Sequence, residues 1–569
     1  MRFMQGVGRD EARLSGASRV GTAPRAVRSV VAEGAASRRV AAFAAMLVSF
    51  FAFSAVAAAP LTVADLDALE FKTVNGVSIR GRGDIAAPGA GSYRNVEDVT
   101  LHGAVGDGRT DDTKAIMAAA EAARASGRPL YFPRNGGNCT YLTRKGIVLT
   151  SGMKVTSDPG VVIRSASATL DGGGRTLRTP LAEPAPKGAT RLVVESTAGL
   201  VPGQEITIWE PGGSYRETLA DIVSVDGNAI EIDTSRFTAD GKNGGLLFER
   251  NASSLVLTDF SLLKTVMARE AVNVVIENVT LQSCGNPDDP YIYTISPINQ
   301  TAQARPTPQN TLRIRNVTID GSTQDGISTQ GSGDIWIEDC VVRDVRHKGI
   351  HWGTSCDRVI VRGNYLLRCG SATAERTSGN GGTGALYFCV NNHRVLIEGN
   401  HVQDCYKGVF GYDYRGNGET DMDSVIAGNT FQNCGKVGVS LLGGRRLVLR
   451  GNVFRHFGGE AVPIVVSGEG RREPKTGLLA SVIAENVIGA FHKSYSNTNG
   501  AIQIAWANGL SLYGNVVEAN TNAPGSAAIR VVNASHVAVT GNVCGGGLDV
   551  SDPGNRDVVL HGNTVGGRK

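Results

Sequence analysis

Short runs of alternating apolar and polar residues, each closed by an asparagine, recur along the second half of the chain. Alternation with a period of two predicts strands, and a repeat of roughly 20–50 residues predicts a repeat architecture. We therefore expect an all-β fold, a single-stranded right-handed parallel β-helix in which each repeat forms one coil. The closing tripeptides are Arg-Gly-Asn364, Glu-Gly-Asn400, Ala-Gly-Asn429, Arg-Gly-Asn452, Ala-Glu-Asn486, Tyr-Gly-Asn515, Thr-Gly-Asn542 and His-Gly-Asn563.

The recurring asparagine has a physical role at the corner between two strands. Asparagine tolerates the left-handed backbone conformation, and its side-chain amide both donates and accepts hydrogen bonds. We expect these asparagines to adopt that conformation and to hydrogen-bond to one another from coil to coil.

The pattern divides the chain into four parts. Residues 1–59 are a signal peptide or N-terminal anchor, 60–165 an N-terminal cap with the first coils, and 166–250 a small β insertion of short alternating strands. Residues 251–569 form the remaining coils, the first over 253–271 and the last over 537–569. We expect this insertion to be a structural addition to the β-helix, a decoration without a binding role. The alternative is that it forms a wall beside the coils that contacts carbohydrate.

Residues 40–59 are apolar, without a charge, and follow a basic segment. This layout is typical of a bacterial secretory signal, whereas an uncleaved membrane anchor is the alternative. We therefore expect a periplasmic or secreted protein, or one anchored in the inner membrane. Because much of the positive charge lies before residue 40, the rest is near neutral and predicts no nucleic-acid binding.

The nine cysteines are odd in number, so they cannot all form disulfides. Cys369, Cys405 and Cys434 each follow a repeat asparagine at the same spacing, and Cys284 holds a similar place after Asn278. We interpret these as a ladder of buried thiols.

A helix is expected ahead of the coils. It begins near Asp112, with Thr110 or Asp111 as its cap, and runs to Ala125. Such a helix would plug the end of the β-helix and hide unpaired strand edges. Its narrow apolar face consists of Ala115, Ile116, Ala119 and Ala122.

The segment around this helix, Gly103-Ala-Val-Gly-Asp-Gly-Arg-Thr-Asp-Asp-Thr-Lys-Ala-Ile116 followed by Tyr131-Phe-Pro133, resembles the N-terminal signature of pectate-lyase-superfamily β-helix proteins. That group includes exopolysaccharide lyases, polygalacturonase relatives and phage tailspike depolymerases. The resemblance implies the fold and a polysaccharide as the partner. It does not imply one reaction, because the same scaffold supports several.

The second strand of each coil offers the best candidate site. Side chains alternate across a strand, so when Ile327, Ile350 and Leu386 point inward, the residues after them point outward. His351, Tyr387 and Tyr412 would then lie on neighbouring coils within one sugar-sized patch. Asp325, Lys348, Lys407, Gln330, Asp413 and Arg415 stand close by.

These residue types suit β-elimination from a uronate-containing chain. Lys348, Lys407 or Arg415 would neutralise the uronate carboxylate, and Gln330 would help to bind the sugar. His351 or Tyr412 would be the base for the C5 proton, and Tyr387 the acid for the leaving oxygen. We therefore expect a polysaccharide lyase.

Three alternatives remain open. A glycoside hydrolase needs two carboxyl groups, for which Asp325 and Asp413 are candidates, but the Asp-Asp and Gly-His-Gly motifs of polygalacturonases are missing. A uronate C5 epimerase would use the same groups as a lyase, and a non-catalytic carbohydrate-binding or adhesion β-helix would use none. No metal ligand set is evident and Ca²⁺ stays open, as do a monomer and a homotrimer.

Overall fold

The computed structural model describes residues 95–566, except 166–176, 211–216, 239, 259, 266–270, 283–295, 301–310, 330, 332, 354–355, 378–381, 390–391, 413–422, 468–477 and 523. The expected signal or anchor at 1–59 lies outside the described residues. Among the residues that are described, no helix is both long and apolar enough to cross a bilayer.

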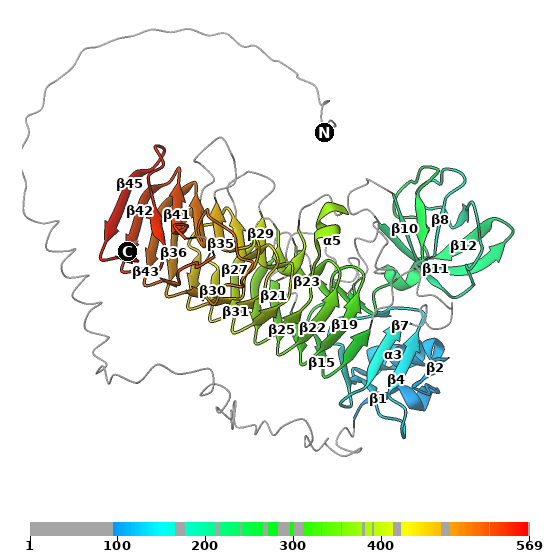
Figure 1. Ribbon diagram of the computed structural model, residues 1–569. Helices are drawn as coiled ribbons and strands as arrows, with labels where there is room; N and C mark the ends of the chain where they lie inside the picture. Colours follow the sequence, from blue (N-terminus) through cyan, green and yellow to red (C-terminus); the bar gives the residue numbers. More distant parts are fainter. Residues whose placement is uncertain are drawn as a thin grey trace, which may run out of the picture. The chain divides into compact units, whose positions relative to one another are not determined.

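Three long parallel sheets run through the described part of the chain, and each strand between the two ends of a sheet pairs with one strand of an earlier coil and one of a later coil. The chain visits the sheets in turn, as β15, β16 and β17 do, before the next coil begins with β18. Figure 1 shows β19 (Thr318–Ser322), β22 (Val341–Val345) and β25 (Tyr365–Leu367), three neighbours in one of these sheets, side by side along successive coils. This topology confirms the expected right-handed parallel β-helix.

The first sheet comprises β1 (Glu97–Asp98), β3 (Leu130–Phe132), β6 (Lys154–Ser157), β15 (Val274–Glu277), β18 (Leu312–Arg315), β21 (Gly333–Glu338), β24 (Asp357–Arg362), β27 (His393–Glu398), β30 (Val425–Ala427), β33 (Val448–Arg450), β36 (Leu478–Ala484), β39 (Ala507–Tyr513), β42 (Ser535–Thr540) and β45 (Arg556–His561).

The second sheet comprises β2 (Asp107–Asp111), β4 (Thr140–Thr143), β7 (Val162–Ser165), β16 (Thr280–Gln282), β19 (Thr318–Ser322), β22 (Val341–Val345), β25 (Tyr365–Leu367), β28 (His401–Gln403), β31 (Thr430–Gln432), β34 (Val453–Arg455), β37 (Val487–Gly489), β40 (Val516–Val517), β43 (Val543–Cys544) and β46 (Thr564–Val565).

The third sheet comprises β5 (Ile147–Val148), β14 (Leu263–Thr265), β17 (Ile298–Gln300), β20 (Ile327–Thr329), β23 (Lys348–Trp352), β26 (Gly384–Phe388), β29 (Lys407–Tyr412), β32 (Val437–Leu442), β35 (Val462–Ser467), β38 (Ile502–Ala505), β41 (Ala527–Val532) and β44 (Gly547–Asp549).

The asparagine ladder lies between the first and second sheets. The side-chain amide of Asn364 donates to Asn400 Oδ1 at 2.9 Å, and the same bond repeats coil by coil to Asn563. The expected stacking is therefore confirmed. The backbone expectation was wrong, because the left-handed residue is the one before each ladder asparagine, for example Gly363 or Glu485. Glycine adopts that conformation at less cost.

The thiol ladder lies at the next corner. Cys369, Cys405 and Cys434 are buried, and the backbone N–H of Cys369 points at Cys405 Sγ, 3.3 Å away. Burial raises the pKa of the Cys369 and Cys434 thiols, so they serve as core residues. Cys284 lies outside the described residues.

Helix α3 (Thr113–Ser126) covers the first coil and follows a short 3-10 helix, η1 (Val99–His102). Ala115, Ile116 and Ala119 are buried in the main core as expected, but Ala123 takes the place predicted for Ala122. The cap residue is Asp112 rather than Thr110 or Asp111. Its carboxylate accepts hydrogen bonds from Val105 and Gly106 outside the helix.

The insertion forms its own antiparallel sheet and core, with a second 3-10 helix, η2 (Ser235–Phe237). A buried Glu205 carboxylate joins it to the coils by contacts to Lys264 and the backbone N–H of Gly146, and within the insertion it also contacts Arg236. Its strands are β8 (Arg178–Pro180), β9 (Arg191–Val193), β10 (Glu205–Trp209), β11 (Glu217–Asp226), β12 (Ala229–Asp233) and β13 (Leu255–Leu257).

Two coil assignments from the sequence need correction. Strand β13 pairs with β8 and β10, so the first part of the expected coil 253–271 belongs to the insertion sheet. Residues 537–569 hold parts of two coils rather than one, because β42 and β45 are successive strands of the first sheet. Short strands with turns of varying length obscured both boundaries.

Candidate functional site

The third sheet carries a row of non-core side chains from coil to coil. His351 pairs in register with Ser328 on one side and Tyr387 on the other, and Tyr387 pairs with Phe410. The residues before them, Ile327, Ile350, Leu386 and Val409, are fully buried in the main core, which confirms the predicted alternation.

The row is not open to solvent, however. His351 is 6% exposed, Tyr387 4% and Phe410 8%, although none of them belongs to the main core cluster. A second layer of residues therefore covers this face. Burial of polar groups here requires partners, because a buried polar group without one costs free energy.

Asp325 supplies the central partner. It lies at the corner that enters β20, is 2% exposed, and its Oδ2 lies 2.8 Å from Nδ1 of His351 on the next coil. Its Oδ1 lies 3.3 Å from His347 Nδ1 and 3.6 Å from Lys348 Nζ. One carboxylate thus faces two imidazoles and an ammonium group.

The charges of this cluster are set by burial and by Lys348. Burial alone raises the pKa of Asp325, but the Lys348 charge and the contact with His351 outweigh it and hold the pKa well below its usual value. Burial and the Lys348 charge lower the pKa of His351, and they lower that of His347 to about 4. At neutral pH the carboxylate is ionised and both imidazoles are neutral.

The ionised carboxylate fixes the proton position on the His351 ring. An ionised carboxylate only accepts hydrogen bonds, so His351 carries its proton on Nδ1 and has a free electron pair on Nε2. His347 Nδ1 faces both Asp325 Oδ1 at 3.3 Å, which only accepts, and Lys348 Nζ at 3.0 Å, which only donates, so these contacts are compatible with either tautomer of His347. His347 Nε2 is buried and has no hydrogen-bond partner among the described residues.

Tyr387 contacts both His351 and Lys348. Its ring packs edge-on against the His351 ring with centroids 5.1 Å apart, and Lys348 Nζ lies 4.9 Å from its centroid. The backbone at Gly382 passes so close that any side chain there would collide with the Tyr387 ring. The structure therefore brings together Asp325, Lys348, His351 and Tyr387, four of the residues predicted for the site.

Lys407 has a different environment from the one expected for a substrate ligand. Its Nζ lies 2.6 Å from Glu375 Oε1 and 4.0 Å from the centroid of the Phe410 ring. Glu375 comes from α5 (Ala372–Thr377), and its Oε2 also contacts Lys436 Nζ at 2.6 Å. In this structure the cluster fastens α5 to the two following coils.

The other predicted residues fall outside what can be described. Gln330, Asp413 and Arg415 lie outside the described residues, and Tyr412 ends β29 with a side chain that is not described. Their assigned roles stay predictions.

Sequence reasoning overlooked two members of the site. His347 is not among the residues predicted for the site, yet it is 5% exposed and lies beside Asp325. Cys389 is not among the predicted residues either, yet its Sγ lies 3.7 Å from His351 Nε2. The sequence signal that could have found His347 is its position in the repeat. His347-Lys348-Gly349 occupies the same corner as Gln324-Asp325-Gly326 does one coil earlier.

In the described part of the chain, no group of three or more His, Cys, Asp or Glu residues is arranged to hold a metal ion. Asp423, an acidic loop residue, pairs with Arg446. Asp288, Asp289 and Asp421 lie outside the described residues.

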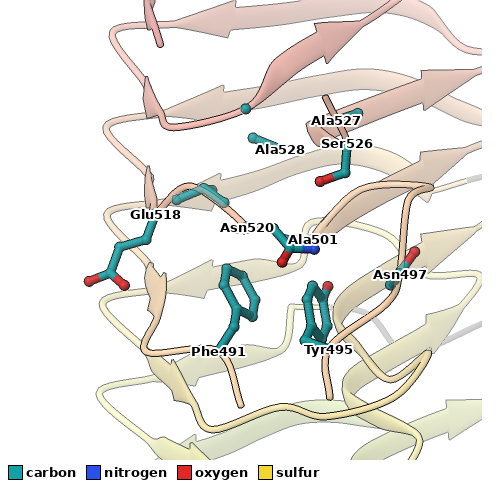
Figure 2. Close-up of a pocket in the computed structure, with 11 residues that line it drawn as sticks. Phe491, Tyr495, Asn497, Ala501, Glu518, Asn520, Ser526, Ala527 and Ala528 are labelled. Atoms are coloured by element: carbon teal, nitrogen blue, oxygen red, sulfur yellow. The ribbon is translucent and has the colours of Figure 1, made fainter. Parts of the chain in front are cut away.

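A pocket lies elsewhere, on the corner between the second and third sheets in the last coils (Figure 2). Phe491 and Tyr495 stack there with ring centroids 4.3 Å apart, and burial raises the pKa of Tyr495 to about 12. The space inside accommodates about one water molecule, so it is too small for a sugar. We assign no function to it.

Two family models match parts of the chain. Residues 306–471 match a right handed beta helix region, and residues 93–181 match the family described as rhamnogalacturonase A/epimerase, pectate lyase-like. No curated protein matches the sequence significantly.

Several solved structures are similar to this chain at low sequence identity. PfbA, a surface adhesin of Streptococcus pneumoniae, is 14% identical, with 83% of this chain and 91% of that chain covered and a TM-score of 0.40. The catalytic unit of an alpha-1,3-glucanase from Streptomyces thermodiastaticus is 13% identical, with 85% and 71% covered and a TM-score of 0.45. The A-module of a mannuronan C-5 epimerase from Azotobacter vinelandii is 14% identical, with 83% and 100% covered and a TM-score of 0.41. The chain is a right-handed parallel β-helix protein with a pectate-lyase-like N-terminal segment.

Proposed function

We propose that this β-helix protein is a carbohydrate-active enzyme that cleaves a uronate-containing polysaccharide by β-elimination. The pectate-lyase-like match over residues 93–181 supports a polysaccharide as the substrate class. The observation that carries the choice of reaction is the buried pair of Asp325 and His351, 2.8 Å apart.

This pair supplies a base of the required kind. A general base must be unprotonated at the working pH and held in a fixed orientation. The lowered pKa of His351 meets the first condition, and the hydrogen bond to Asp325 meets the second. Asp325 is a positioning residue here, because it acts through His351.

The proposed step balances as follows. Nε2 of His351 takes the proton from C5 of the uronate, and the released electron pair forms the double bond between C4 and C5. The bond from C4 to the glycosidic oxygen breaks, and the Tyr387 hydroxyl protonates that oxygen. Lys348, close to the Tyr387 ring, would balance the charge that builds on the uronate carboxylate.

The lowered pKa values of the Asp325 and Glu375 carboxyl groups disfavour hydrolysis at this face. A hydrolase needs a carboxylic acid that is protonated at working pH, which requires a raised pKa. The pKa of Asp325 is instead held well below its usual value. Burial raises the pKa of Glu375, but hydrogen bonds from Lys407, Lys436 and Tyr406 outweigh this and lower it to about 2.

The test is a substrate panel with purified protein lacking residues 1–59. Alginate, pectin, gellan, hyaluronan and bacterial exopolysaccharides are incubated with and without Ca²⁺, in D₂O and in H₂O. We expect ultraviolet absorbance from the C4–C5 unsaturated product. Deuterium at C5 without cleavage would reassign the enzyme as an epimerase, and new saturated reducing ends would reassign it as a hydrolase. No change in any polymer would support a binding protein.

A further inference from the structure

The sulfur of Cys389 lies at the outer end of a chain of contacts that begins inside the protein. Asp325 is 2% exposed and His351 6% exposed, whereas Cys389 is partly exposed. Asp325 Oδ2 lies 2.8 Å from His351 Nδ1, and His351 Nε2 lies 3.7 Å from Cys389 Sγ. Of the three groups, the thiol is therefore the one that solvent reaches most easily.

The proton on His351 Nδ1 determines in which direction a proton can move along these contacts, from the thiol to His351. Because Asp325 can only accept, His351 donates from Nδ1 and presents the free electron pair of Nε2 to the sulfur. A carboxylate that orients an imidazole, which in turn faces a thiol, is the general arrangement that activates a cysteine nucleophile. The thiolate is the reactive form, and a neighbouring base helps to generate it.

We propose that Cys389 is a reactive thiol, a site of covalent modification by small electrophiles, with His351 as the base that accepts its proton. In alkylation by iodoacetamide, the sulfur forms a bond to the methylene carbon and the carbon–iodine bond breaks. Iodide leaves, and the thiol proton passes to His351 Nε2 and then to water. With hydrogen peroxide as oxidant, the sulfur forms a bond to one peroxide oxygen, the O–O bond breaks, and a sulfenic acid and water result.

The other described cysteines provide the comparison. Cys139 is also partly exposed but has no imidazole in contact with its sulfur among the described contacts. Cys340, Cys356, Cys369, Cys405, Cys434 and Cys544 are buried. A reagent that acts by exposure alone would label Cys139 and Cys389 alike, whereas activation by His351 singles out Cys389.

Modification has a further consequence that rests on the proposed function. A group added to Cys389 Sγ would stand in front of His351 Nε2, where the uronate C5 must approach. Alkylated or oxidised protein would then lose lyase activity, and reduction of the sulfenic acid with a thiol would restore it.

The experiment is timed alkylation of the native protein with iodoacetamide at neutral pH, with each cysteine quantified by peptide mass spectrometry. We expect Cys389 to react about tenfold or more faster than Cys139. His351→Gln and Asp325→Asn should each slow Cys389 toward the rate of Cys139. The Cys139 rate and the protection of the buried cysteines should stay unchanged, which shows that each variant is folded.

The thiol proposal is overturned if Cys389 reacts no faster than Cys139, or if its rate is the same in folded His351→Gln. These readouts need no substrate, so they stand or fall separately from the lyase assignment. If Cys389 is alkylated rapidly but a measured lyase activity persists, the thiol proposal holds and the placement of the substrate at His351 fails.

Discussion

The Nδ1 atom of His351 lies 2.8 Å from Oδ2 of Asp325, and both side chains are buried although they come from different coils. This contact crosses from the corner before β20 to the middle of β23. Neighbouring coils stack about 4.8 Å apart, so a side chain at the corner of one coil can reach a side chain on the strand of the next coil.

Replacing Asp325 by asparagine should reduce lyase activity by about 10²–10⁴-fold. The amide can donate to Nδ1, so the His351 proton would move to Nε2 and remove the free electron pair. The rate of unsaturated product formation measures the effect. Asp320→Asn is the matched control, because Asp320 lies on the same coil as Asp325, is more exposed and pairs with Arg343 of the next coil. This substitution should leave the rate within about twofold of wild type.

Acid should destabilise the fold through His347. Its pKa falls from 6.5 to about 4 on folding, so the unfolded chain binds more protons between these values. Stability is therefore full above about pH 6.5 and is lost as the pH falls toward 4, by at most about 3 kcal/mol. Denaturant midpoints across this range measure the slope. His347→Gln should flatten it, whereas an equal slope in that variant would show that other groups cause the acid sensitivity.

Glu375→Gln should loosen α5 and destabilise the protein by roughly 2 kcal/mol, because the buried Lys407 charge would lose the carboxylate that offsets it. Chemical denaturation measures the loss. Asp344→Asn removes a comparable but exposed pair with Arg368 and should cost less than about 1 kcal/mol. Equal effects of the two substitutions would mean that the Glu375 cluster is not a structural anchor.

Asn452→Ala should cost about 2–4 kcal/mol, because the Asn452 amide bonds to Asn486 and Ile426 and accepts from Asn429. Each lost bond leaves a buried polar group without its partner. Asn522→Ala, at an exposed position, should change the unfolding free energy by less than about 0.5 kcal/mol. Similar values for the two variants would refute a stabilising role for the ladder.

The sequence predicted the fold well because the ladder asparagines and the inward residues recur at every coil. It placed His351 beside Tyr387 for the same reason, since both follow an inward residue in equivalent strands. It missed His347 and Cys389 because their roles depend on contacts between coils and on burial by covering segments. It assigned Lys407 to substrate because the partner, Glu375, lies in a short helix that the strand pattern does not predict.

The most direct measurement of the central claim is formation of the C4–C5 unsaturated product by wild type, His351→Gln and His536→Gln on the polysaccharide that the panel identifies. His536 is exposed and lies in a late coil, so its replacement controls for the loss of an imidazole as such. We predict that His351→Gln is at least about 10²-fold slower while His536→Gln retains the wild-type rate. Wild-type activity in folded His351→Gln would show that another group takes the C5 proton.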